Sequence, residues 1–247
     1  MICTSLKIIT QITNGVLLGD QTITIKKIVL NSKNVSPKSL FLAIIGKKFD
    51  AHDFCKEAIN KGCSALLVQR KIPTTFPQII VKNTLIALKK IAKWNRDQFN
   101  PIMIAITGSL GKTSVKEITA NILNHYGHTL YTQYNYNNAI GVAITLLNLN
   151  KSHQFAVIEL GASKPGEIYS SVQLVRPFLV LINNIYPVHL QGFKSLSGIA
   201  RSKQEIFSGL SKKGIAILNE DSNNWSEWKN KLHKTKVFFF SIKKKTF

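Results

Sequence analysis

Short apolar runs alternate with amphipathic stretches throughout residues 101–247. Each run is four to six residues long and mostly apolar, which predicts a buried strand. The predicted strands are 102–107, 129–132, 155–160, 178–183, 215–219 and 237–240. The amphipathic stretches predict helices at 114–126, 140–147, 166–174, 196–207 and 225–232. Strands that alternate with helices in this way predict an α/β fold with a mainly parallel sheet.

A smaller α/β block precedes this region. Helical spacing over 6–13 stops at Asn14-Gly15, and a second helix is predicted over 54–60. The predicted strands of the block are 22–30, 40–45, 65–68 and 78–81. Asn83 then caps a helix that ends at Asn100-Pro101. We expect an N-terminal domain over 1–82, a connecting helix over 83–100 and a second domain over 101–247.

The turn after strand 102–107 has the composition of a phosphate-binding loop. Gly108 and Gly111 allow backbone N–H groups to point inward, and the following helix N-terminus adds the positive end of its dipole. Lys112 is placed to reach the β- and γ-phosphates, and the Thr113 hydroxyl to bind Mg²⁺. Because Ile106 stands where G-x-x-x-x-G-K-[ST] needs glycine, the loop is a shorter variant. The predicted nucleotide-binding residues are Thr107, Gly108, Ser109, Leu110, Gly111, Lys112, Thr113 and Ser114.

Polar residues also end other predicted strands, and ligands of parallel sheets bind at the carboxyl ends of the strands. Glu159 ends a buried strand beside the loop, which suits a Mg²⁺ ligand, although a strand-end acid can instead cap the next helix. His189 is a candidate metal or phosphate partner and is also compatible with an ordinary loop histidine. Lys203, on predicted helix 196–207, is by itself expected to be solvated.

The formal net charge of +21 is compatible with nucleic-acid binding. The basic residues, however, are almost all lysine and are scattered through every segment, whereas a binding stripe would gather them among aromatic residues. Frequent Lys, Asn and Ile favour an A/T-biased genome as the cause. We therefore expect no nucleic-acid partner.

The compartment follows from cysteine usage and hydropathy. Three cysteines without CxxC spacing predict neither a disulfide framework nor a zinc site, and they indicate a reducing cytoplasm. No apolar run approaches the roughly 20 residues of a membrane span. The N-terminal segment has no basic region followed by a long apolar core. We expect a cytoplasmic monomer without membrane insertion.

Several segments, in order, resemble the motifs of the Mur ligase family: TGSLGKTSVKE, NYNNAIGV, VIELGASKPGEI, VHLQGF, ARSKQEIF and ILNEDSNNW. The N-terminal segment SLFLAIIGKKFDAHDF resembles that family's uridine-nucleotide-binding domain. The resemblance covers almost the whole chain. Folylpolyglutamate synthetases share the ATP-binding core but lack this N-terminal block, and a family member that adds a diamino acid is expected to differ at ELGASKPGEI.

The resemblance implies an ATP- and Mg²⁺-dependent amide ligase of peptidoglycan precursor synthesis. Its substrates would be UDP-N-acetylmuramoyl-tripeptide and D-alanyl-D-alanine. The substrate carboxylate would take the γ-phosphoryl group of ATP to give an acyl phosphate, which the dipeptide amine then displaces.

The resemblance also implies roles for single residues. Thr113 and Glu159 would serve one metal ion and His189 a second, and Lys203 matches a lysine that is carbamylated near the metals. Asn219 matches a position near the adenine. The implied catalytic residues are Lys112, Lys203 and His189, and the implied substrate-binding residues are Ser32, Lys33, Asn135, Asn137 and Asn138.

The chain departs from the family pattern in several places. Lys33 replaces an arginine, Leu110 a small polar residue, Gln191 an acid and Gln204 a glycine. Family members also carry a third, C-terminal domain. We therefore expect this chain to stop inside its second domain, as a fragment of the ligase or as a non-catalytic remnant that still binds nucleotide.

Overall fold

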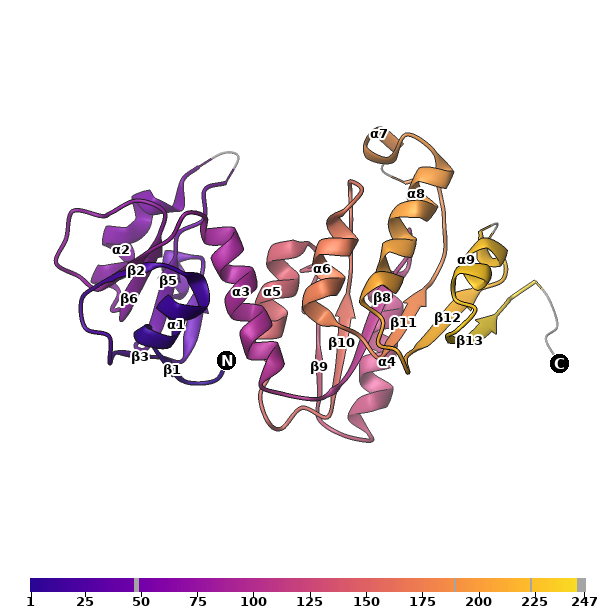
Figure 1. The fold of residues 1–247 in the computed structure, drawn as a ribbon, viewed down its shortest axis with the longest axis horizontal. Coiled ribbons are helices and arrows are strands. Elements are labelled where there is room, and N and C mark those ends of the chain that lie inside the picture. Colours follow the sequence, from indigo (N-terminus) through magenta and orange to yellow (C-terminus); the bar gives the residue numbers. More distant parts are fainter. Residues whose placement is uncertain (47–48, 189, 223, 244–247) are drawn as a thin grey trace. The chain divides into compact units, whose positions relative to one another are not determined.

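The computed structural model describes residues 1–46, 49–188, 190–222 and 224–243. The chain divides into two compact units, Met1–Gln98 and Phe99–Phe247 (Figure 1). Each unit is built around its own mainly parallel sheet, which for the second unit confirms the prediction from its alternating strands and helices.

The first unit has a five-stranded sheet in the order β2-β7-β6-β5-β4. Its strands are β2 (Val16–Leu18), β4 (Lys27–Val29), β5 (Ser39–Leu42), β6 (Ala65–Val68) and β7 (Gln78–Ile80). All neighbours in this sheet are parallel except β2 and β7. One face packs Phe41, Leu66 and Val68 against Cys55 and Ala58 of helix α2 (Cys55–Asn60), and this cluster forms the core of the unit.

Helices α1 (Leu6–Thr13) and α3 (Thr84–Asp97) pack against each other in the first unit. Each begins at a side-chain cap: Ser5 Oγ accepts the N–H of Ile8, and Asn83 Oδ1 accepts the N–H of Ile86, which confirms the cap predicted at Asn83. The side chain of Asn95 also accepts the N–H of Ile2 at 2.9 Å, so α3 is tied to the start of the chain.

The predicted strand 22–30 is wrong, because the chain changes partners at Lys26. β3 (Thr24–Ile25) pairs antiparallel with β1 (Thr4–Ser5) in a separate two-stranded sheet, whereas β4 pairs parallel with β5. The N–H of Lys26 donates to the carbonyl of Lys38 between the two strands. The apolar residues before and after Lys26-Lys27 therefore belong to strands of two different sheets.

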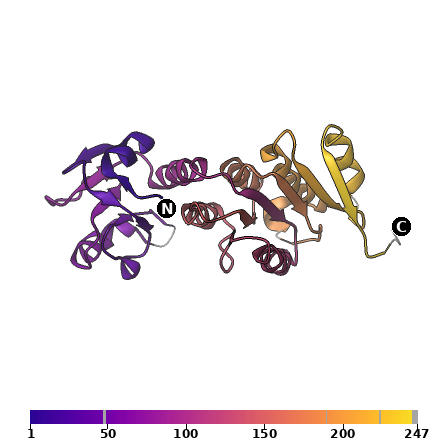
Figure 2. The ribbon, with the colours of Figure 1, turned by 90° about the horizontal axis from the view of Figure 1, so that it is seen from below.

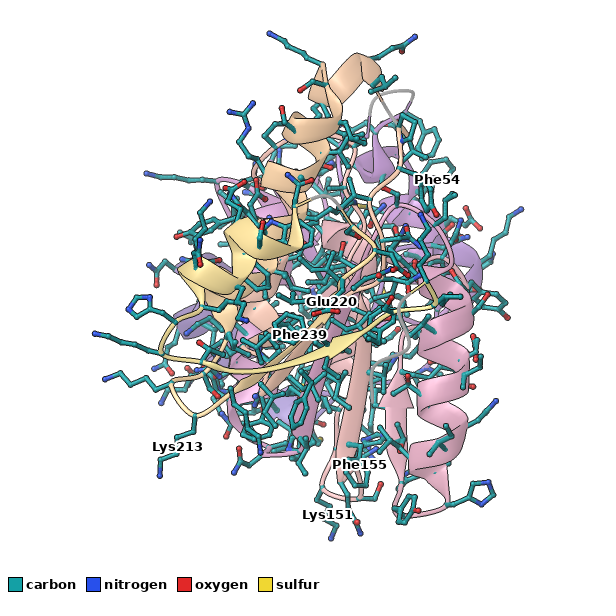
Figure 3. The ribbon with its side chains drawn as sticks, turned by 90° about the vertical axis from the view of Figure 1, so that its right-hand side faces the viewer. Phe54, Lys151, Phe155, Lys213, Glu220 and Phe239 are labelled. Carbon is teal, nitrogen blue, oxygen red and sulfur yellow. The ribbon has the colours of Figure 1, made fainter. Side chains whose placement is uncertain are left out.

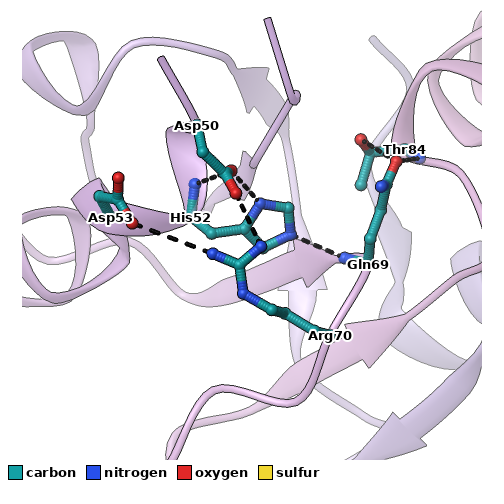
Figure 4. A network of polar contacts seen from close by, with 6 residues as sticks. All are labelled: Asp50, His52, Asp53, Gln69, Arg70 and Thr84. Atoms are coloured by element: carbon teal, nitrogen blue, oxygen red, sulfur yellow. Dashed lines mark hydrogen bonds and ion pairs between the residues drawn. The ribbon is translucent and has the colours of Figure 1, made fainter.

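A partly buried polar network holds together the segment before α2, the end of β6 and the start of α3 (Figure 4). The Gln69 N–H donates to His52 Nε2 at 2.8 Å, so Nδ1 carries the ring proton and donates to the Asp50 carboxylate. Arg70 donates to the other Asp50 oxygen at 2.7 Å, and Gln69 Oε1 accepts the N–H of Thr84 at 2.9 Å. Burial of the Asp50 carboxyl opposes its ionisation, but the hydrogen bonds from His52 and Arg70 outweigh this effect and lower its pKa.

The second unit has a six-stranded, all-parallel sheet in the order β13-β12-β11-β8-β10-β9. All six strands lie within one residue of their predicted bounds: β8 (Ile102–Thr107), β9 (Thr129–Tyr131), β10 (Phe155–Glu159), β11 (Leu179–Ile182), β12 (Ile215–Asn219) and β13 (Lys236–Phe240). The strands β8, β10 and β11 are central and carry apolar side chains on both faces. This explains why they appear in the sequence as continuous apolar runs.

Helices cover both faces of this sheet (Figure 2). On one face, Ile104, Ile106 and Val157 pack against Ala120 and its neighbours on α4 (Lys112–Asn124). The other helices of the unit are α5 (Ala139–Leu147), α6 (Glu167–Val175), α7 (Leu190–Phe193), α8 (Leu196–Lys203) and α9 (Trp225–Lys231). Among them, α5 contacts β10 and α6 contacts β8.

The predicted helix 196–207 is only partly correct. The α-helix ends at Lys203 and tightens into a 3₁₀ helix, η3 (Gln204–Gly209). In this arrangement Glu205 accepts the N–H groups of Gly166 and Tyr169 at 2.7 and 2.9 Å, so it caps the N-terminus of α6. The end of α8 is thus fixed against a neighbouring helix.

Among the residues that the structure describes, no helix is long and apolar enough to cross a lipid bilayer.

The Asp50 network predicts an acid-sensitive contribution to stability. Because folding lowers the pKa of Asp50 below its unfolded value of about 3.9, its stabilisation is fully present above that value and is lost as the pH falls through the folded pKa. We expect Asp50→Asn to lower the free energy of unfolding by about 1–3 kcal/mol at pH 7. The difference from the unsubstituted protein, measured by urea unfolding from pH 7 to pH 3, should shrink on acidification. A difference that stays constant over this range would contradict the assignment.

Candidate functional site

A loop with unpaired backbone donors follows β8. Gly108 and Gly111 have φ angles of 152° and 71°, which favour glycine, and Gly111 begins helix α4 without a side-chain cap. The N–H groups of Lys112, Thr113 and Ser114 therefore have no acceptor among the described residues. Unpaired donors at the positive end of a helix dipole form a binding site for an anion such as phosphate.

The ammonium group of Lys112 folds back over this loop. Its Nζ donates to the carbonyl of Ser109 at 3.0 Å. Partial burial lowers the pKa of Lys112, and the carboxylate of Glu159 opposes this shift. An incoming phosphate could therefore replace the Ser109 carbonyl as the hydrogen-bond acceptor of Lys112 Nζ.

Two asparagines at the end of β11 hold the tip of the loop. The carbonyl of Leu110 accepts from Asn183 Nδ2 at 2.8 Å and from Asn184 Nδ2 at 3.0 Å. Asn184 Oδ1 in turn accepts the Leu110 N–H at 2.9 Å. Leu110 itself is half exposed, so its side chain is not needed for this contact. The loop shape depends on these asparagines, which are not among the residues predicted above although they lie at the end of the predicted strand 178–183.

The carboxylate of Glu159 lies at the end of β10, beside the start of α4. Its side chain accepts from the Thr113 hydroxyl at 3.0 Å and from Asn137 Nδ2 at 2.7 Å. Glu159 is only 1% exposed. A carboxylate and a hydroxyl at this separation are hard oxygen ligands of the kind that Mg²⁺ takes.

No group of three His, Cys, Asp or Glu side chains within the described parts of the chain could hold a metal ion by itself. The residues present still fit Mg²⁺, because that ion is usually held by one or two carboxylates and completes its shell with water and substrate phosphates. Glu159 and Thr113 supply the protein oxygens, and the adjacent loop offers donors to phosphate.

Lys203, at the end of α8, is a buried lysine without an anionic partner. It is 2% exposed, and none of the described residues accepts a hydrogen bond from its ammonium group or forms an ion pair with it. Burial, with a smaller contribution from the charge of Lys112, lowers the pKa of Lys203 to about 8, against weaker opposing effects of Glu205 and Glu167. The structure thus contradicts the expectation of a solvated lysine, and the side chain has an accessible neutral form near neutral pH.

Lys112 and Lys203 line one cavity of about 380 Å³ in the second unit. Its walls come from the loop after β8, the start of α5, the segment between β10 and α6, and the end of α8. The lining residues are Ser109, Lys112, Asn137, Asn138, Gly161, Ala162, Ser163, Glu167, Val188 and Lys203. The cavity brings together residues from motifs that lie far apart in the sequence.

The other predicted residues of this unit lie in different surroundings. Asn138 lines the cavity and caps α5 through the N–H of Gly141, while Asn135 is exposed and does not line it. Thr107 and Asn219 use their side chains within the protein: Thr107 donates to the carbonyl of Leu160, and Asn219 to the carbonyl of Asn183. Ser114 is exposed at the start of α4. His189 lies outside the described residues.

Ser32 and Lys33 line a second cavity, of about 490 Å³, in the first unit. Its other lining residues are Leu30, Asn31, Phe41, Phe49, Ala51, Phe54 and Glu57. Ser32 lies in the short 3₁₀ helix η1 (Ser32–Asn34) and donates to Glu57 at 2.9 Å. Ala51 and Phe54 belong to η2 (Ala51–Phe54), the segment that the Asp50–His52 network ties to β6. Aromatic walls beside a cationic side chain suit a ligand with a flat ring and an anionic group.

The chain matches two family models along its length: "Mur ligase family, catalytic domain" over residues 24–96 and "Mur ligase middle domain" over residues 106–247. It is 54% identical to the UDP-N-acetylmuramoyl-tripeptide–D-alanyl-D-alanine ligase of Buchnera aphidicola (subsp. Baizongia pistaciae), over 99% of this chain and 55% of that protein. The chain spans about half the length of the curated relatives that it matches.

Solved structures give the same result. A crystal structure of MurF from Acinetobacter baumannii superposes with a TM-score of 0.93 at 34% identity, covering 97% of this chain and 54% of that one. The MurF ligase of Thermotoga maritima, solved in complex with ADP, superposes with a TM-score of 0.79 at 29% identity, covering 88% and 51%. The family resemblance of the sequence motifs is therefore confirmed, and the chain belongs to the Mur ligase family.

Proposed function

We propose that the protein acts in an ATP-dependent amide ligase that joins D-alanyl-D-alanine to UDP-N-acetylmuramoyl-tripeptide in peptidoglycan precursor synthesis, in the cytoplasm. The observation that carries this proposal is the site at the end of β8 and β10, where unpaired N–H donors, Lys112 and the Glu159–Thr113 pair converge. High identity to relatives with this name supports the choice of substrates. The likeness to a solved ligase whose name includes 2,6-diaminopimelate, at 16% identity, is a likeness of fold alone.

The second unit would bind ATP with its phosphates over the N-terminus of α4. The backbone N–H groups of residues 112–114 would donate to the phosphates, and the Lys112 ammonium would neutralise charge that develops on the transferred phosphoryl group. The asparagines that hold the loop tip would keep its donors aligned before ATP arrives. The ADP in the Thermotoga maritima structure supports nucleotide binding by this fold.

Glu159 and Thr113 would hold Mg²⁺ beside these phosphates. Bound there, the ion would supply Lewis-acid stabilisation of phosphate charge. Asn137 would orient the Glu159 carboxylate through its 2.7 Å hydrogen bond. Phosphoryl transfer to the substrate carboxylate then activates it for attack by the dipeptide amine, so the protein acts mainly by positioning and charge neutralisation.

The first unit would bind the uridine nucleotide in the cavity at Ser32 and Lys33. Phe49 and Phe54 offer aromatic surface for a flat base, and the Lys33 ammonium offers a charge for the diphosphate. Lysine gives a point charge where arginine would give a two-pronged contact, so we expect a weaker but still favourable interaction with the diphosphate.

Lys203 would react with CO₂ to give a carbamate, with loss of one proton from the amine. A buried ammonium whose described contact is the ring of Phe193, without an anion or a hydrogen-bond acceptor, is costly, whereas a carbamate would present anionic oxygens to the cavity. The lowered pKa supports this reaction, because only the neutral amine attacks CO₂.

Substitution of Lys112 tests the ATP site. ATP with Mg²⁺ should raise the melting temperature of the protein, since a ligand that binds only the folded state stabilises it. Lys112→Ala should abolish most of this shift and leave the melting temperature without ligand nearly unchanged, because among the described residues the Lys112 ammonium donates a hydrogen bond only to the loop carbonyl of Ser109. Differential scanning fluorimetry measures both. Equal ATP-induced shifts in the two proteins would rule out this site.

Carbon-13 NMR tests Lys203. Protein in ¹³C-bicarbonate should show a carbamate carbonyl resonance that grows between pH 7 and pH 9, as the amine with a pKa of about 8 loses its proton. Lys203→Ala should lack the resonance. The matched control is Lys213→Ala, because Lys213 is exposed and points away from the second unit (Figure 3). A resonance that persists in Lys203→Ala would show that another amine is modified.

A further inference from the structure

Lys116, one turn into helix α4, is a fully buried lysine that the ATP site described above does not use. Its exposed fraction is 0%. Nζ donates to the carbonyl of Thr132 at 2.6 Å, pairs with Glu117 at 2.6 Å and lies 5.6 Å from the ring centroid of Tyr131. A carbonyl, a carboxylate and a ring face thus accommodate the three N–H bonds of one ammonium group.

These contacts connect the two halves of the metal site. Lys116 lies three residues after Thr113 on the same helix, so its tether fixes this helix against the end of β9. Thr132, which directly follows β9, receives that tether on its carbonyl and accepts the backbone N–H of Glu159 on its hydroxyl at 3.0 Å. An unbroken chain of contacts therefore runs from the helix of Thr113 to the backbone of Glu159.

Burial of this ammonium needs a reason beyond packing. A methionine would fill a similar volume without the cost of removing a charge from water. The lysine instead donates a directional hydrogen bond to the Thr132 carbonyl. Such a bond helps to keep the Thr113 hydroxyl and the Glu159 carboxylate, which come from different elements, 3.0 Å apart.

We propose that Lys116 is a positioning residue that, through Thr132, sets the Thr113 hydroxyl against the Glu159 carboxylate and so determines how strongly Mg²⁺ increases the affinity for ATP. The proposal rests on the ATP and Mg²⁺ site proposed above. Lys116 is thus a second buried lysine, besides Lys203, for which we propose a role, and its burial distinguishes it from the exposed lysines of the chain.

Calorimetric titration with ATP tests the proposal, once with Mg²⁺ and once with EDTA. The quantity of interest is the ratio of the two dissociation constants. Lys116→Met should reduce this ratio by about 10-fold to 100-fold, the usual effect of removing a group that orients a metal ligand, and should leave the affinity for metal-free ATP within about 2-fold. A purely structural role would lower the melting temperature of Lys116→Met and leave the ratio unchanged.

Thr132→Val provides a second test that keeps Lys116 and its carbonyl acceptor but removes the hydroxyl that accepts from Glu159. It should lower the ratio in the same way, and it decides the matter if Lys116→Met does not fold. Lys213→Met, at an exposed position, should retain the ratio. A ratio at the unsubstituted value in Thr132→Val, or equal losses of affinity with and without Mg²⁺ in Lys116→Met, would overturn the proposal. Absence of ATP binding by the unsubstituted protein would instead overturn the proposed ATP site itself.

Discussion

A buried carboxylate at the end of a parallel strand organises the second unit. Removal of a carboxylate from water costs several kcal/mol unless hydrogen bonds replace the lost hydration. Glu159 receives such bonds from the hydroxyl of Thr113 and the amide of Asn137. Those partners come from the start of α4 and from the segment before α5, so both elements must approach the end of β10 closely. The cavity that contains Lys112 and Lys203 is the space that this convergence leaves.

The lysines of this basic chain differ in burial and in partners from one place in the fold to another. Most lysines are exposed, and the net charge of +21 then says little about function. Lys112, Lys116 and Lys203 differ from them because each is partly or fully buried near the end of β8, β9 or β10. Lys112 faces the loop carbonyl, Lys116 is paired, and Lys203 has no anionic partner among the described residues. Burial and partners, more than charge, therefore distinguish the lysines for which we propose binding, positioning and reactive roles.

Hydrophobic patterning predicts the second sheet well, because its central strands are covered on both faces and must be continuously apolar. It fails at 22–30, where the apolar residues on the two sides of Lys26-Lys27 belong to β3 and β4 in different sheets, and the pattern does not tell which strand each segment pairs with. The phosphate loop is visible in the sequence because its glycines and Lys112 are contiguous. The contacts of Asn184 with Leu110 and of Thr132 with Lys116 cannot be predicted from the sequence, because they depend on how β11 lies beside β8 and how β9 lies beside α4.

We propose that each unit contains a nucleotide site and that the two sites differ in chemistry. Hydrogen–deuterium exchange measured with each ligand separately tests it most directly. ATP with Mg²⁺ should slow exchange in residues 108–114 and 159–161, and UDP-N-acetylmuramoyl-tripeptide should slow it in residues 30–33 and 49–57. Protection of the same unit by both ligands, or of neither unit by saturating ligand, would contradict the account.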